Sequence, residues 1–117
     1  MATGKIIAPS TALTPKSFTL THNAGTPVNS SAYVYGKLAI INVMSAAKSW
    51  SQNDVVFTVP AAYRPLVALT PNVFFGGSGI SVAGTCKFSN TDGKFTVNLP
   101  ASIGNSRCYV NFCYFIA

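Results

Sequence analysis

The chain has 117 residues, of which 49% are hydrophobic and only 9% are charged, and it carries one histidine and two acidic residues. This length fits a single domain, and so few ionisable side chains leave little material for acid–base catalysis or for a metal site. An ordinary globular domain has about a quarter of its residues charged, so we expect part of the exterior to be an interface.

The net charge of +6 comes from eight Lys and Arg residues that are spread along the chain. Nucleic-acid-binding proteins usually gather such residues on one face or arm, so we expect no nucleic-acid site. No stretch reaches the ~20 apolar residues of a membrane helix, and we expect no membrane insertion. The diffuse positive field would still attract polyanions, such as the phosphate-bearing teichoic polymers of a bacterial wall.

The first sixteen residues carry two prolines and no sustained periodicity, so they are predicted to be a linker or lead-in segment to a domain that spans 17–117. Residues 18–22 alternate and predict a first short strand. The segment AGTPVNSSA is loop by composition.

Residues 33–44 predict the next sheet element, with Tyr33 and Tyr35 on the same face as Ala39, Ile41 and Val43. Gly36 interrupts this element and marks either a bulge or the join of two strands. The polar segment SAAKSWSQND, which holds the single Trp, is predicted to be a connection.

A period of two over residues 55–59 predicts another strand, and Pro60 and Pro65 then bound the corner AAYRP. The glycine-rich segment FFGGSGISVAGT is predicted to form a bend, followed by a hairpin with one polar face around the turn NTDG. Further strands are predicted at 66–70 and 80–83, and PASIGNS is predicted to be a turn.

The last predicted strand covers 107–117 and is apolar on both faces, which predicts that the terminus is buried at the centre of the fold or along a symmetry axis. Seven to nine short strands with frequent turns and no convincing helix predict an all-β fold. We expect an antiparallel β-sandwich or jelly roll.

The order of these motifs resembles the C-terminal head domains of phage tail-fibre and baseplate receptor-binding proteins. In those domains a strand ends in a P-x-x-Y-R-P corner, here PAAYRP, and an x-x-D-G-x-x-x-V hairpin follows, here NTDGKFTV. The resemblance covers roughly 48–99. It implies a homotrimeric head in the phage tail or baseplate, made in the host cytoplasm and contacting other tail or baseplate proteins, that adsorbs to the host cell surface.

An enzyme is not expected, because His22, Asp54 and Asp92 are the only candidates for acid–base chemistry and Asp92 already shapes the Asp-Gly turn. The same scarcity predicts no metal and no cofactor.

The cysteines are Cys86, Cys108 and Cys113; the last two lie five apart on one strand and so point to opposite faces. Buried free thiols are expected for all three, with a disulfide as the alternative.

Binding is the remaining class of function, and the candidate saccharide-binding residues are Trp50, Tyr63, Arg64 and His22. Trp50 is either a platform for a sugar ring or an anchor that pins its loop to the core or to a neighbouring subunit. Arg64 is either a clamp for a phosphate or carboxylate or a partner of a carbonyl or an aspartate. His22 is either a ligand-binding group or an ordinary edge histidine.

These observations favour non-catalytic recognition of a host cell-surface saccharide or teichoic-type polymer. A structural tail or baseplate module that only holds subunits together is the alternative, and a polysaccharide-degrading fragment is a third hypothesis.

Overall fold

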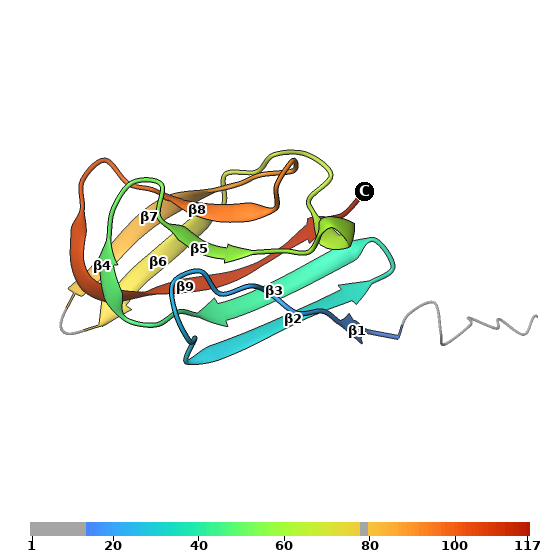
Figure 1. Ribbon diagram of the computed structural model, residues 1–117, viewed down its shortest axis with the longest axis horizontal. Coiled ribbons are helices and arrows are strands. Elements are labelled where there is room, and N and C mark those ends of the chain that lie inside the picture. The colour runs from blue at the N-terminus through green and yellow to red at the C-terminus, as the bar shows by residue number, and fades with distance from the viewer. Residues whose placement is uncertain (1–13, 78–79) are drawn as a thin grey trace, which may run out of the picture.

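A computed structural model describes residues 14–77 and 80–117, and its architecture is all-β and antiparallel, as the sequence predicts (Figure 1). The short turn of 3-10 helix covers Ala61–Tyr63. The strands are β1 (Lys16–Ser17), β2 (Asn29–Tyr35), β3 (Leu38–Met44), β4 (Lys48–Trp50), β5 (Val55–Thr58), β6 (Asn72–Gly77), β7 (Ile80–Phe88), β8 (Lys94–Asn98) and β9 (Ile103–Phe115).

The expectation of two packed sheets is corrected, because the strands form one continuous curled sheet in the order β1-β2-β3-β9-β6-β7-β8-β5, with β4 also paired to β9. The 13-residue strand β9 joins the two halves, since it pairs with β3 and β4 as well as with β6. Thr21 and Thr58 exchange two backbone hydrogen bonds of 2.9 Å, which tie the segment after β1 to β5 at the other edge of the sheet. The curl therefore encloses a core with one sheet instead of two.

The core lies on the inner face of this sheet and is centred on stacked aromatic rings. Phe57 stacks on Phe95 with ring centroids 4.6 Å apart, and Phe88 meets Tyr114 edge to face at 4.9 Å. Such pairs stabilise a core beyond the burial of their area. The alternation within β8 and β9 sends Phe95 and Tyr114 inward and leaves the intervening residues on the outer face.

Gly36 joins two strands, which was one of the two alternatives, and the predicted faces of this element are wrong. Gly36 has a φ of +59°, and with Lys37 it forms a two-residue turn between the paired Tyr35 and Leu38. Because the turn separates two strands, Tyr33 and Tyr35 point outward while Ala39, Ile41 and Val43 point into the core.

Several segments differ from the predicted elements. Two predicted strands are absent: residues 18–22 contribute only the bridge at Thr21, and residues 66–70 only the bridge at Leu69. Strand β2, in contrast, begins earlier than predicted, at Asn29. The segment SAAKSWSQND contains β4, FFGG lies in β6, and β9 begins at Ile103 within the predicted turn PASIGNS. For β2, β4, β6 and β9, pairing with a neighbouring strand overrides a composition that favours turns, whereas 18–22 and 66–70 each form only one isolated bridge.

The β7–β8 hairpin has the predicted polar and apolar faces. Lys87 pairs with Thr96 on the outer face, while Phe88 and Phe95 pair within the core. The backbone N–H of Lys94 donates to Asp92 Oδ1 at 3.0 Å, and Gly93 takes a φ of +72°.

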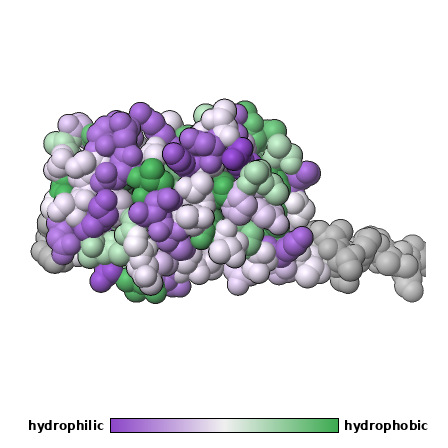
Figure 2. All heavy atoms as spheres, in the orientation of Figure 1, coloured by the Kyte–Doolittle hydropathy of each residue, from purple (hydrophilic) through white to green (hydrophobic). Residues whose placement is uncertain are grey.

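The outer face of the last strand is exposed in this chain, so the prediction of burial on both faces is not met within one copy. Phe115 is 65% exposed, and Cys113 is also exposed, which corrects the expectation that all three thiols are buried; Cys86 and Cys108 are buried and free. Figure 2 shows hydrophobic residues between hydrophilic ones on the surface that it draws.

Candidate functional site

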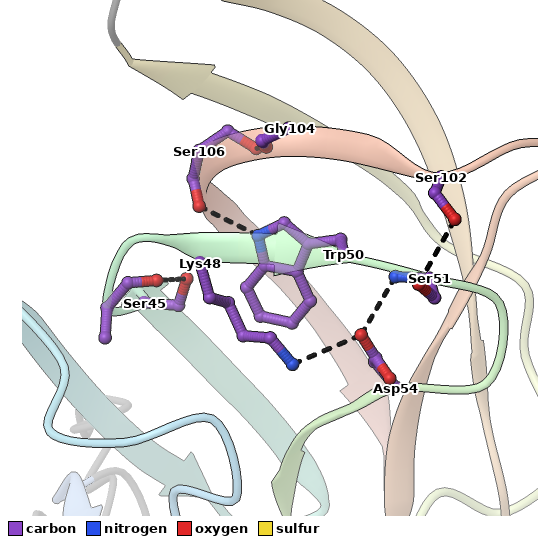
Figure 3. Close-up of polar contacts among 9 residues, drawn as sticks. Ser45, Lys48, Trp50, Ser51, Asp54, Ser102, Gly104 and Ser106 are labelled. Carbon is purple, nitrogen blue, oxygen red and sulfur yellow. Dashed lines mark hydrogen bonds and ion pairs between the residues drawn. The ribbon is translucent and has the colours of Figure 1, made fainter.

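Trp50 is an anchor within the core, which was one of the two alternatives for it, so its place among the candidate saccharide-binding residues is corrected (Figure 3). Its side chain has no exposed surface, its ring packs against Phe75 at 5.8 Å, and Nε1 donates to the carbonyl oxygen of Ser106 at 2.8 Å. The short pairing of β4 with β9 carries the indole inward. No face of the ring is left for a ligand.

The polar groups around Trp50 are occupied by one another (Figure 3). Asp54 Oδ2 accepts from the backbone N–H of Ser51 at 2.9 Å and from Lys48 Nζ at 3.1 Å. The first of these hydrogen bonds, followed by the hydrogen bond and charge of Lys48, lowers the pKa of Asp54. Lys48 Nζ also lies 4.8 Å from the centre of the Trp50 ring. This cluster stabilises the loop and presents no free reactive group.

Tyr63 and Arg64 lie in the proline corner, at the end of the molecule opposite β4 in Figure 1. The ring of Tyr63 stacks on Phe18 at 4.2 Å, and its carbonyl oxygen accepts from the hydroxyl of Tyr114 at 2.8 Å. Burial raises the pKa of Tyr114, which keeps that hydroxyl protonated as a donor. Tyr63 therefore has a structural role in joining the corner to β9.

Arg64 packs against the turn of the β7–β8 hairpin. Its Nε is buried without a hydrogen-bond partner in the described residues, and its Cγ would lie 3.3 Å from a Cβ placed on Gly93. The pKa of Asp92 is lowered, chiefly by the hydrogen bond from the Lys94 backbone and also by the charges of Lys94 and Arg64. Arg64 thus contributes positive charge beside this turn.

His22 is half-buried, and its Nε2 lies 2.9 Å from Ser30 Oγ. Desolvation by burial lowers the pKa of His22, so the imidazole is neutral near pH 7. The four residues predicted from the sequence do not form one site, because Trp50 is separated from Tyr63 and Arg64 by the length of the domain (Figure 1).

A groove of about 490 Å³ on the outer face of the sheet has the composition of a saccharide site, and sequence reasoning missed it. Four asparagines from four different strands line it together with two aromatic rings and a methionine. They are Asn29, Asn42, Asn72, Asn111, Phe74, Tyr109 and Met44. We call this the asparagine groove.

Strand register brings these side chains together. Asn42 lies opposite Asn111, and Met44 lies opposite both Asn29 and Tyr109. Tyr109 in turn lies opposite Phe74 on its other side. Because residues two apart share a face, the outer positions of β2, β3, β9 and β6 form one surface.

The chemistry of the asparagine groove suits a sugar. All four asparagines are exposed, and in the part of the chain that the structure describes their side-chain amides make no hydrogen bond. Each amide offers both donors and an acceptor for hydroxyl groups. Phe74 is 45% exposed, and the centre of its ring lies 6.3 Å from that of Tyr109. An aromatic surface therefore lies beside the amides. An apolar sugar face could pack there while its hydroxyls reach the asparagines.

The asparagines were missed because Asn42 and Asn111, taken alone, are ordinary polar residues of a strand, while Asn29 and Asn72 lie outside the predicted strands. Only the pairing of β3 with β9 places Asn42 beside Asn111. The available signal was one asparagine within each of two otherwise largely apolar predicted strands, 33–44 and 107–117.

Within residues 14–77 and 80–117, no group of three or more potential metal-ligating side chains occurs. Among the same residues, no helix has the length and hydrophobicity needed to cross a bilayer.

The fold matches that of a phage head domain. No protein-family model matches the sequence, and no curated protein is similar to it. Among solved structures, the head domain of phage bIL170, described among the receptor-binding domains of lactococcal phages, aligns with a TM-score of 0.65. The alignment covers 89% of this chain and 100% of that domain at 13% identity. The resemblance predicted from the sequence is therefore confirmed at the level of the fold.

Proposed function

We propose that this chain is the receptor-binding head of a phage tail protein and that it binds a saccharide of the host cell surface without catalysis. The observation that carries the proposal is the likeness in fold to the bIL170 head domain, which extends over the whole of that domain. The asparagine groove supports the saccharide as ligand, since its amides and rings match the two kinds of surface that a sugar presents.

The binding experiment uses labelled protein and purified cell walls from lactococcal strains and from unrelated bacteria. We expect the double variant Asn42→Ala/Asn111→Ala to lower adsorption to a recognised wall by about tenfold or more, because two amides that face the ligand are removed. Asn90→Ala is the matched control, since Asn90 is an exposed asparagine in the β7–β8 turn.

Three results would contradict this assignment. Unchanged adsorption of the double variant would remove the asparagine groove as the site. An intact oligomer that binds none of the walls would favour the alternative, a structural tail or baseplate module. The exposed apolar residues on the outer face of the sheet are consistent with that alternative. Saccharide release that disappears when both aspartates are replaced would instead indicate a degrading enzyme.

A homotrimer is the proposed assembly, with an apolar patch on the outer face as the contact surface. The patch continues the rows of the asparagine groove toward the C-terminal ends of β2 and β9 and toward the N-terminal end of the antiparallel β3. It consists of Tyr33, Tyr35, Leu38, Ile40, Cys113 and Phe115. Burial of such residues between copies would account for the low charge of the chain.

Mass measurement in solution tests the assembly. A trimer should have three times the 12.3 kDa of the chain, and Phe115→Ser should shift it toward the monomer because Phe115 is among the most exposed apolar residues. Val28→Ser is the control, since Val28 is 57% exposed in the loop before β2, outside the patch. A wild-type chain that is monomeric at micromolar concentration would refute the trimer.

A further inference from the structure

A second groove, of about 370 Å³, lies on the outer face of the β7–β8 hairpin. One wall is the segment 68–70, which continues the sheet beside β7 because Leu69 and Phe88 exchange backbone hydrogen bonds of 3.0 and 2.8 Å. Lys87 and Lys94 both line this groove, and both side chains are exposed. We call it the lysine groove.

The two lysines face the same side of the hairpin. Lys87 pairs with Thr96, and Lys94 lies two residues before Thr96 on β8, so all three point outward. Diagonal neighbours of this kind lie close enough for both ammonium groups to reach one ligand.

Neither lysine forms an ion pair in the part of the chain that the structure describes. Asp54 is paired with Lys48 at 3.1 Å, and no described carboxylate lies within 4.0 Å of the ammonium group of Lys87 or Lys94. Asp92 also lines the groove; its Oδ1 accepts the Lys94 backbone N–H, and the charges of Lys94 and Arg64 both act on its carboxylate. Two lysines and one arginine therefore face a single carboxylate, which leaves the region positive.

Hydroxyl and apolar groups complete the lysine groove. Thr70, Ser89 and Thr96 line it, and the Thr70 hydroxyl makes no hydrogen bond in the described part of the chain. Ala68 and Leu69 add apolar surface along the same wall. Cations and hydroxyls suit an anionic oxygen group, and the apolar wall suits a carbon chain attached to it.

We infer that the lysine groove binds the phosphodiester group of a polyol-phosphate or sugar-phosphate polymer, an inference that rests on the proposed role in host recognition. A phosphodiester carries one delocalised negative charge and accepts hydrogen bonds from both lysines. Dispersed cations elsewhere make an extended nucleic-acid track a poor fit.

The two grooves adjoin on the same face of the sheet. Asn72 of the asparagine groove lies opposite Thr85, and Lys87 follows two residues along β7. One strand spacing and two residues of rise place the Cα atoms of Asn72 and Lys87 ~8 Å apart. A polymer that alternates sugar or polyol units with phosphates could thus occupy both grooves at once.

The test measures binding of a fluorescent glycerol-phosphate oligomer and of a neutral oligosaccharide of similar length. Lys87→Gln/Lys94→Gln should weaken binding of the phosphate oligomer by about tenfold, since two charged donors are lost. The control Lys16→Gln/Lys37→Gln removes the same charge from exposed positions outside the groove and should have a much smaller effect. Wild-type binding should also weaken as salt rises from about 50 to about 300 mM.

Cell walls provide the second arm and separate this inference from the proposed function. Treatment of the walls that cleaves phosphodiesters should abolish the difference in wall binding between the wild-type protein and the Lys87→Gln/Lys94→Gln variant. This holds for any phosphate polymer that the wall contains. Equal losses in both lysine pairs, or salt-insensitive binding, would overturn the inference. If no wall is bound but the oligomer still distinguishes the two lysine pairs, the proposed host recognition fails and the phosphate site stands.

Discussion

Trp50→Ala is expected to lower the free energy of unfolding by about 3–5 kcal/mol, which is a large share of the stability of a domain of this size. The indole has no exposed surface, so its removal opens a cavity beside Phe75. It also strips the carbonyl of Ser106 of the hydrogen bond from Nε1. Urea unfolding followed by circular dichroism measures the change.

Trp50→Phe is the matched variant, because it keeps an aromatic ring in the core and loses only the indole N–H and part of the volume. We expect it to cost about 1–3 kcal/mol and to leave adsorption of the folded protein unchanged. A Trp50→Ala variant of wild-type stability that no longer adsorbs would contradict the structural role and restore Trp50 as a ligand platform.

The strands that the sequence predicts best are those whose signal is local. Phe95 and Val97 alternate with polar residues after an Asp-Gly turn, and both the pairing and the faces of β8 follow from this pattern. The fold itself depends on distant pairing. Nothing local reveals that β9 bridges the two halves of one curled sheet by pairing with both β3 and β6.

The faces of β2 and β3 show a second limit of prediction from the sequence. Tyr33, Tyr35 and Ile41 are an even number of residues apart, so a single strand would place them on one face. The Gly36-Lys37 turn reverses the chain, and Tyr35 pairs with Leu38 while Ile41 lies in the core. The tyrosines thereby contribute to the outer apolar patch and are absent from the core.

The candidate site was harder to predict because it is made by register. A tryptophan in a polar loop suggests an exposed ring, yet a single short pairing of β4 with β9 buries Trp50. Conversely, Asn42 and Asn111 are unremarkable until β3 and β9 are aligned. Residue type suggested a saccharide as the ligand to propose, while the place of a candidate site emerged only from the pairing of the strands.

Gly93→Ala is expected to destabilise the domain by about 2 kcal/mol or more, through the turn that supports the lysine groove. Gly93 has a φ of +72°, which alanine adopts only with strain, and a Cβ there would lie 2.7 Å from the carbonyl oxygen of Val59. The Val59 N–H donates to the Gly93 carbonyl at 3.0 Å, so the turn cannot move away without losing this contact to the segment after β5.

Asn90→Ala, in the same turn, separates this effect from a general intolerance of the hairpin to substitution. Asn90 is exposed and has no positive φ, so its replacement should change stability by no more than about 0.5 kcal/mol. Because Lys94 follows Gly93 directly, the folded fraction of Gly93→Ala should also bind the glycerol-phosphate oligomer more weakly than the Asn90→Ala protein does. Equal midpoints of urea unfolding for Gly93→Ala and Asn90→Ala would show that the turn can shift to accommodate a side chain at position 93. The close approach of Gly93 to Val59 would then have no part in holding the lysine groove.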